Sequence, residues 1–214
     1  MTTMDWINRD KIIAIVRGLD PEPMAKLAEA LLAGGITLME VTFNQARPET
    51  WKDTARSIRT IRERFAGRML AGAGTVMSPE QLGLAADAGA EYIISPHADE
   101  AVIRETRARG LVSLPGALTP TEIAAAWRAG ANAVKLFPAG DLGPAYVKAV
   151  RAPLSHIPLL AVGGITETNC AQFLSAGCSG VGVGGNLVNK QWIENGEFDR
   201  ITALAKEFVR AAGR

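Results

Sequence analysis

Short apolar runs alternate with longer amphipathic stretches along almost the entire chain. Eight of the apolar runs have the length of a β-strand and lie near residues 11–17, 38–43, 70–76, 92–96, 112–116, 133–138, 159–164 and 180–185. Stretches typical of amphipathic helices lie near 21–34, 48–65, 79–88, 99–109, 120–129, 143–151, 167–176 and 197–212. Runs that are apolar on both faces are typical of parallel strands covered by helices on each side. The alternation therefore predicts a parallel sheet.

A small residue followed by glycine ends several of the helical stretches, just before the next apolar run. Gly34, Gly89, Gly130 and Gly177 occupy this place. Glycine suits the left-handed residue that follows a helix. Eight such units favour an α/β fold, a single (β/α)₈ barrel of the TIM type formed by residues 1–214. A doubly wound open sheet is the alternative that the same alternation allows.

Composition and charge narrow the classes of function. The chain has 214 residues, of which 48% are hydrophobic and 21% charged, and a formal net charge of +1. This balance is ordinary for a globular protein and gives no reason to expect a nucleic acid or an anionic membrane as partner. No apolar run reaches the length of about 18 residues that a membrane span needs. The start of the chain lacks the pattern of a signal peptide, and there are only two cysteines, so we expect a cytoplasmic protein.

Two charged side chains stand inside predicted strands instead of at their ends. Lys135 interrupts the run 133–138, and Glu40 interrupts the run 38–43. Burial disfavours the charged form of lysine, and a neutral amine can condense with a carbonyl to form a Schiff base. A buried carboxylate with a raised pKa could move the protons that this chemistry requires. The alternative is a buried ion pair with no catalytic role, which would contribute little to stability.

Glycine pairs end the last two predicted strands. Gly163-Gly164 follows the seventh strand, and Gly184-Gly185 follows the eighth. In many barrels of this class these two strand ends hold a phosphate through backbone N–H groups. Arg17 ends the first strand, next to the eighth in a closed barrel, where it could add a charged contact. Alternatively, the glycines only relieve crowding and Arg17 is a solvated loop residue.

The remaining candidates for special chemistry are weaker. His97 is near Asp99 and Glu100, but no second histidine is close in the sequence, so we predict no metal site. Asp99 is better explained as the N-cap of the following helix. Cys170 and Cys178 are expected to pack as small apolar residues.

The residues at the strand ends resemble one family. Its motifs lie between Ile12 and about Leu187 and include Glu40-Val41-Thr42, Gly72-Ala73-Gly74-Thr75-Val76, Ser95-Pro96, Pro115-Gly116, Val134-Lys135-Leu136-Phe137-Pro138, Val162-Gly163-Gly164 and Gly184-Gly185. The chain resembles the class I aldolases that act on 2-keto-3-deoxy-6-phosphogluconate and 4-hydroxy-2-oxoglutarate, the KDPG/KHG aldolases. The lysine and glutamate motifs together carry most of this resemblance.

The resemblance implies an enzyme that needs no metal or other cofactor and that assembles as a homotrimer of barrels. It implies that Lys135 forms the Schiff base with the keto acid and that Glu40 shuttles protons. The residues expected at the pyruvate end are Thr75, Pro96 and Phe137. Those expected at the phosphate end are Gly163, Gly164, Gly184, Gly185 and Asn186. Arg17 and Thr42 complete the set of expected substrate-binding residues, together with Asn44.

Asn44 departs from the pattern of the phosphogluconate enzymes, which have an arginine four residues after the glutamate. Asparagine at this place resembles a related branch that acts on 2-keto-3-deoxy-6-phosphogalactonate. Its amide cannot replace the bidentate contact of an arginine with a carboxylate. Arg47 or Arg17 would have to supply the missing charge.

We therefore predict an aldehyde-lyase that cleaves 2-dehydro-3-deoxy-6-phosphogluconate to pyruvate and glyceraldehyde 3-phosphate and that could also accept 4-hydroxy-2-oxoglutarate. The galactonate epimer is the alternative substrate, because of Asn44. Two further hypotheses stay open. One is a different enzyme on a phosphorylated substrate, such as an epimerase or a synthase. The second is a non-catalytic barrel that binds a phosphorylated ligand.

Overall fold

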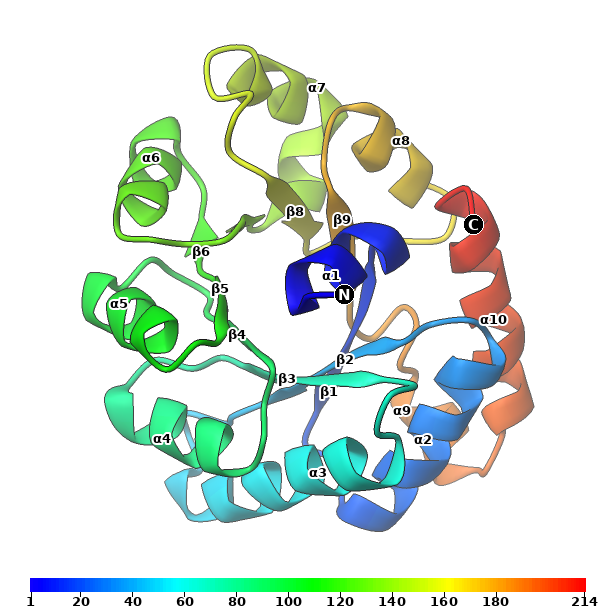
Figure 1. Ribbon diagram of the computed structural model, residues 1–214. Helices are drawn as coiled ribbons and strands as arrows, with labels where there is room; N and C mark the ends of the chain where they lie inside the picture. Colours follow the sequence, from blue (N-terminus) through cyan, green and yellow to red (C-terminus); the bar gives the residue numbers. More distant parts are fainter.

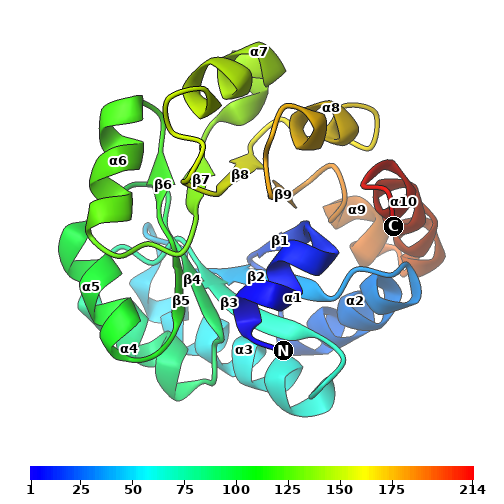
Figure 2. The same ribbon diagram turned by 45° about the horizontal axis from the view of Figure 1, so that its top comes forward.

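A closed ring of parallel strands with helices outside it forms the body of the protein (Figures 1 and 2). The computed structural model describes the backbone of residues 1–214 and every side chain except that of Pro21. The strands of this ring are β1 Ile12–Arg17, β2 Leu38–Thr42, β3 Leu70–Gly74, β4 Tyr92–Ile94, β5 Val112–Leu114, β6 Gly116–Ala117, β7 Val134–Leu136, β8 Leu159–Val162 and β9 Gly180–Val183. The predicted α/β barrel is confirmed.

The fifth predicted strand is divided in two by Pro115, which explains why the ring has nine strands instead of eight. The strand order is β5-β4-β3-β2-β1-β9-β8-β7-β6, so the two ends of the order are consecutive in the chain. Proline has no N–H to donate to a strand ladder. Its carbonyl still accepts a hydrogen bond of 2.8 Å from the backbone N–H of Lys135, which helps to close the ring.

The helices follow the predicted alternation, with four main differences. They are α1 Thr3–Asp10, α2 Pro21–Ala33, η1 Pro48–Thr50, α3 Trp51–Arg64, α4 Pro79–Asp87, α5 Glu100–Ala108, α6 Pro120–Arg128, α7 Ala139–Arg151, α8 Cys170–Ser175, α9 Lys190–Glu194 and α10 Phe198–Ala211. The first turn of the stretch predicted at 48–65 is the 3₁₀ helix η1. The helices α1 and α9 were not predicted. The stretch predicted at 143–151 begins earlier, at Ala139, and is interrupted by Gly143, whose φ of 75° is not helical.

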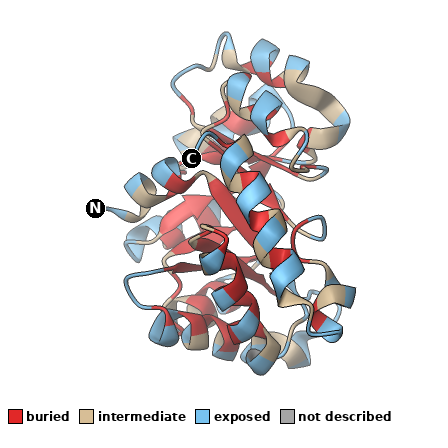
Figure 3. Cartoon of the chain, turned by 90° about the vertical axis from the view of Figure 1, so that its right-hand side faces the viewer, coloured by how far each residue is buried: buried red, intermediate tan, exposed pale blue. Residues whose placement is uncertain are grey.

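Two layers of apolar side chains hold these elements together. The outer layer lies between the strands and the helices, and it includes most of the buried residues (Figure 3). The inner layer fills the barrel from Ile13, Leu38, Leu70 and neighbouring strands, and Ile7 of α1 joins it. Figure 1 shows α1 in front of the strands, across one end of the barrel. The opposite end, where the parallel strands terminate, is left for the loops that carry the candidate chemistry.

Local capping supports the helix boundaries. Asp99 accepts a 2.9 Å hydrogen bond from the backbone N–H of Val102, so its predicted role as the N-cap of α5 is confirmed. Thr119 and Glu122 form a reciprocal capping box at the start of α6. Caps of this kind contribute on the order of 1 kcal/mol each. Among the described residues, no helix is both long enough and apolar enough to cross a membrane.

Candidate active site

Lys135 is held in the interior of the barrel by strand β7, and only 5% of its surface is exposed. Its Nζ lies 5.0 Å from the centroid of the Phe137 ring. Burial lowers the pKa of the Lys135 amine; the negative charge of Glu40 opposes this effect, and the positive charge of Arg17 adds to it. A larger fraction of this amine is therefore in the neutral, nucleophilic form than for a lysine in water at the same pH.

Glu40 lies on strand β2, across the barrel from Lys135, and its side chain is buried. Burial raises the pKa of its carboxyl group, although the charges of Lys135 and Arg17 partly oppose the shift. Its Oε2 has no hydrogen-bond partner among the described residues. No close ion pair joins Glu40 to Lys135 within the described part of the chain. The two side chains are therefore not in direct contact, although their charges act on each other, and Oε2 of the carboxyl group is left unpaired.

Strand β3 makes room for Glu40 because it carries glycine where the neighbouring strands carry side chains. A Cβ atom on Gly74 would lie 1.8 Å from Oε1 of Glu40. One on Gly72 would lie 2.0 Å from the ring of Tyr92. No real Cβ approaches another atom so closely, so both glycines are required by the two large side chains that lean over β3.

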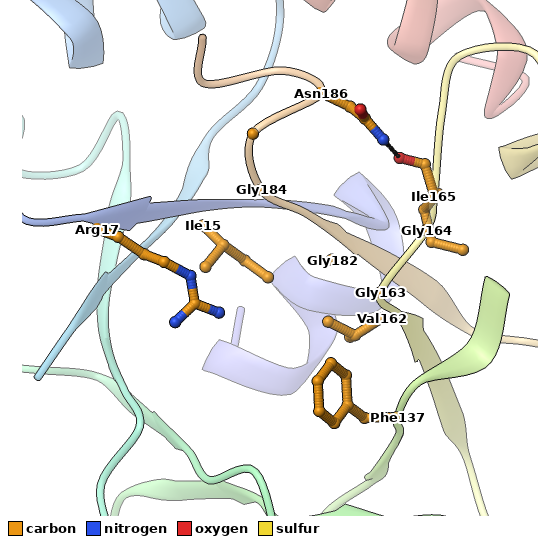
Figure 4. A pocket seen from close by; sticks show the side chains of 11 residues that line it. Ile15, Arg17, Phe137, Val162, Gly163, Gly164, Ile165, Gly182, Gly184 and Asn186 are labelled. Carbon is orange, nitrogen blue, oxygen red and sulfur yellow. Dashed lines mark hydrogen bonds between the residues drawn. The ribbon is translucent and has the colours of Figure 1, made fainter. Parts of the chain in front are cut away.

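A cavity of about 260 Å³ opens where β8 and β9 end (Figure 4). We call it the glycine cavity. It is lined by Ile15, Arg17, Phe137, Val162, Gly163, Gly164, Ile165, Gly182, Gly184, Gly185 and Asn186. Gly163 and Gly164 have φ values of 90° and 71°, a conformation that most other residues adopt only with strain. Both glycine pairs and Arg17 thus meet at one cavity, and the phosphate site expected there stays a prediction.

The charge in the glycine cavity comes from Arg17. Figure 4 shows its guanidinium directed into the space between Ile15 and Phe137. Phe137 also contacts the amine of Lys135, so the cavity begins beside the candidate nucleophile. A cationic side chain and glycine backbone form a suitable environment for an anionic group at a fixed distance from the amine.

Asn186 joins two loops at the edge of this cavity. Its Nδ2 donates a hydrogen bond of 2.8 Å to the carbonyl of Ile165, and Figure 4 shows the same contact. One of the two amide hydrogens is therefore committed to the protein. The side chain fixes the loops after β8 and β9 relative to each other, in addition to lining the cavity.

The other predicted binding residues lie outside the glycine cavity. Thr42 is buried and donates a 3.1 Å hydrogen bond to the carbonyl of Val16. Asn44 is exposed, and its Oδ1 accepts a 3.0 Å hydrogen bond from the N–H of Ala46. Asn44 and Arg47 line a second, polar cavity of about 210 Å³. Since Arg47 pairs with Glu49 at 3.2 Å, Arg17 is better placed to supply charge near Lys135.

Thr75 and Pro96 lie in the loops after β3 and β4, at the same end of the barrel as Glu40. Thr75 has a φ of 55°, and its carbonyl accepts a hydrogen bond of 2.6 Å from Nε2 of Gln45. The carbonyl of Pro96 packs so close to Gly116 that a Cβ there would lie 2.3 Å from it. The described residues hold no cluster of three or more His, Cys, Asp and Glu side chains that could bind a metal.

Comparison with known proteins identifies the family of the chain. The family model for KDPG and KHG aldolase matches residues 4–204. The chain belongs to this aldolase family. It is 36% identical to the 2-dehydro-3-deoxy-6-phosphogalactonate aldolase of Escherichia coli (strain K12) over 209 residues, which is 97% of each chain.

Solved structures agree with the fold of the aldolase. A native KDPGal structure is 37% identical, with a TM-score of 0.83, and the match covers 94% of this chain and 93% of the other. A KDPG aldolase from Legionella pneumophila, with pyruvate captured as a covalent carbinolamine intermediate, is 28% identical with a TM-score of 0.82. That match covers 92% of this chain and 93% of the other.

Sequence reasoning missed three polar residues near the elements that carry the candidate site. They are Tyr92 inside the barrel and the pair Gln45 and Gln81, which connects the loops after β2 and β3. The apolar run that begins at Tyr92 predicts a side chain facing either the barrel interior or the helices, but nothing in the sequence places Tyr92 near Glu40. The amides gave no signal, since their partners come from loops that are far apart in the sequence.

Proposed function

We propose that the aldolase works through a Schiff base on Lys135 and that its substrate is a phosphorylated 2-keto-3-deoxy sugar acid. The observation that carries this proposal is the buried amine of Lys135, whose pKa is lowered by burial in a barrel that also holds a buried carboxyl group. Glu40 is the proton-transfer residue. The glycine cavity accepts the phosphate through the loops after β8 and β9 and through Arg17.

The chemistry follows from these assignments. The neutral amine of Lys135 attacks the C2 carbonyl to form a carbinolamine. Protonated Glu40 then gives its proton to the carbinolamine hydroxyl, which leaves as water, so that an iminium ion and the Glu40 carboxylate remain. Glu40 takes the proton of the C4 hydroxyl as the C3–C4 bond breaks, so that glyceraldehyde 3-phosphate leaves. The electrons of that bond form an enamine on the pyruvate fragment. Protonation at C3 and hydrolysis then release pyruvate and restore the amine.

The galactonate epimer is the substrate we favour. Asn44 resembles that branch of the family, and the relative from Escherichia coli with 36% identity is a 2-dehydro-3-deoxy-6-phosphogalactonate aldolase. The gluconate epimer is the second candidate, supported by the match to the KDPG and KHG aldolase model. The homotrimer implied by the resemblance stays a prediction, which light scattering would check against the 22.6 kDa mass of one chain.

The Schiff base is tested by reducing the protein with borohydride in the presence of pyruvate. The wild type is expected to gain one reduced pyruvate adduct on Lys135, found by peptide mass spectrometry. Lys135→Ala is expected to lose the adduct and at least about a thousand-fold in turnover, because no other amine occupies this place. The matched control is Lys148→Ala, an exposed lysine on α7, which should keep both. An adduct that persists in Lys135→Ala would overturn the assignment.

The choice of substrate is tested by measuring pyruvate release from the two phosphorylated epimers side by side. We expect kcat/KM to be at least about tenfold higher for the galactonate epimer, a difference of about 1.4 kcal/mol in transition-state binding. Equal values, or a preference for the gluconate epimer, would contradict the preference while leaving the aldolase mechanism intact. Binding of either compound without pyruvate release would instead support the non-catalytic barrel.

A further inference from the structure

Tyr92 is a buried polar side chain for which the proposed mechanism has no use. It begins strand β4, and its side chain is fully buried in the inner layer of the barrel. Its hydroxyl has no hydrogen-bond partner among the described residues. The only other buried side-chain atom of the described residues in this state is Oε2 of Glu40. A buried polar atom without a partner costs about 1–3 kcal/mol, so two of them in one barrel call for an explanation.

The register of the sheet places the two side chains on one line. Glu40 on β2 is paired with Gly72 on β3, and Gly72 is paired with Tyr92 on β4. Since Gly72 has no side chain, the ring of Tyr92 lies over β3, where a Cβ on Gly72 would be 2.0 Å from it. The ring therefore extends from β4 over β3 toward β2, and the charge of Glu40 and the backbone of Met39, both on β2, influence the pKa of the phenol.

We propose that Tyr92 is a positioning residue for Glu40, acting through a water molecule held between the phenol hydroxyl and Oε2 of the carboxyl group. A buried water is stable where it finds two or more polar partners, and these two atoms are otherwise unpaired. The inference rests on the proposed function, because it gives Glu40 the proton-transfer role. Tyr92 is fully buried and does not line the glycine cavity, so it acts on Glu40 and not on the substrate.

The phenol is suited to donate a hydrogen bond in this arrangement. Burial, together with the charges of Glu40 and Glu91, raises the pKa of Tyr92 well above its ordinary value, so the hydroxyl keeps its proton. The other charged groups that influence Glu40 are Lys135 on β7 and Arg17 on β1. A hydrogen bond from the Tyr92 hydroxyl, passed on by the water, stabilises the ionised form of Glu40, which must accept a proton from the substrate.

The test is Tyr92→Phe, which removes one oxygen and keeps the ring that fills the barrel. The carboxyl of Glu40 is followed in the free protein by NMR with ¹³C-labelled glutamate, and Glu40→Gln identifies its resonance. We expect the titration midpoint of Glu40 to rise by about one pH unit in Tyr92→Phe. The acid limb of the pH profile of kcat should move by the same amount, with KM unchanged within about twofold.

Tyr146→Phe is the matched control, since Tyr146 is the only other tyrosine of the chain and donates to the carbonyl of Leu118 near the surface. It should leave the Glu40 midpoint unchanged. If the titration midpoint of Glu40 is also unchanged in Tyr92→Phe, the inference is wrong. A gain in thermal stability in Tyr92→Phe would also overturn it, because it would mean that the hydroxyl is unpaired in solution. The NMR midpoint requires no turnover. If the wild type failed to trap pyruvate, the proposed function would be wrong, but the NMR result on the coupling between Tyr92 and Glu40 would still stand.

Discussion

The reactivity proposed for Lys135 and Glu40 depends on individual residues that keep water away from these side chains and leave them space. Both side chains are buried, and burial is the largest cause of the lowered pKa of the amine and the raised pKa of the carboxyl group. The space for Glu40 comes from Gly74, on the neighbouring strand. The carboxyl group proposed to transfer protons is therefore positioned by the absence of a side chain as much as by any contact.

Adding one methyl group to Gly74 tests this dependence. In Gly74→Ala the new Cβ would lie 1.8 Å from Oε1 of Glu40, so the carboxyl group must move. We expect kcat to fall at least about a hundred-fold, because a shift of about 1 Å in a catalytic group costs this much. Overpacking should also cost about 1–3 kcal/mol of the free energy of unfolding.

Gly83→Ala is the control for this substitution, because Gly83 lies in the helix α4 and no atom is within 4 Å of its added Cβ. Alanine there should keep the activity and add up to about 1 kcal/mol of stability. Activity near that of the wild type in Gly74→Ala, measured as pyruvate release, would show that Glu40 does not need this position.

The residues found from the sequence are those that break a local pattern. Lys135 and Glu40 are charges inside apolar strands, and the glycine pairs stand at strand ends, so all could be predicted one by one. Tyr92 breaks no pattern, because tyrosine is common in strands. Its significance depends on pairing with Gly72 and on Glu40 one strand further, which is a property of the folded sheet.

At the scale of elements, a chain of side-chain amides connects the loop after β2 to the loop after β3. Nε2 of Gln81 donates to Oε1 of Gln45 at 3.0 Å, and Nε2 of Gln45 donates to the carbonyl of Thr75 at 2.6 Å. Oε1 of the buried Gln81 accepts from the N–H of Met77 at 2.7 Å. These bonds hold Thr75 at a positive φ, a conformation that costs a residue other than glycine about 1 kcal/mol or more.

Gln81→Met removes this connection with little change in side-chain volume. We expect a loss of about 1–3 kcal/mol in urea unfolding, because the N–H of Met77 is left without a partner. Since the resemblance to the aldolase family implies that Thr75 lines the pyruvate end, KM for the keto acid should rise several-fold while the Lys135 adduct still forms. Gln172→Met, at an exposed position of α8, should change neither quantity. A KM equal to that of the wild type would remove Thr75 from the binding site.

Element boundaries were predicted less well than element types. Apolar runs located every strand of the barrel, but they gave no sign that Pro115 divides the fifth one, since its missing hydrogen bond matters only once the neighbouring strands are known. The helix α1 was missed although its capping box, Thr2 with Asp5, is visible in the sequence. It has only eight residues, and its apolar face packs on a barrel end that exists only in the folded protein.

At the scale of the whole molecule, the two ends of the chain meet at one buried carboxylate. Asp10, at the end of α1, receives hydrogen bonds from Trp6, Arg9 and Thr37, and Arg214 approaches it at 2.9 Å. The guanidinium of Arg214 also donates to the backbone carbonyl of Asp10 at 3.0 Å. This contact lies at the barrel end opposite the candidate active site. We therefore expect it to affect the stability of the fold and not the chemistry of Lys135 and Glu40.

The charge of Asp10 gives stability that depends on pH. Burial alone would raise the pKa of its carboxyl group, but hydrogen bonds from Arg9 and Thr37 and the charges of Arg214 and Arg9 lower it below the ordinary value. A carboxyl group whose pKa is lower in the folded state contributes its stability fully above its unfolded pKa of about 3.9. The contribution is lost as the pH falls through the folded value.

Asp10→Asn is therefore expected to lose about 3 kcal/mol of the free energy of unfolding at pH 7, because two arginines are left without their charge partner. The difference between wild type and variant should shrink as the pH falls below about 4. Subtracting the two urea unfolding series removes the contribution of Glu40, whose raised pKa has the opposite sign and is common to both proteins. Asp141→Asn, at an exposed position of α7, should show no such difference. The difference in unfolding free energy between wild type and Asp10→Asn could instead stay constant from pH 7 to pH 3. The loss would then come from altered hydrogen bonds of the amide, and the charge of Asp10 would contribute nothing to joining the two ends of the chain.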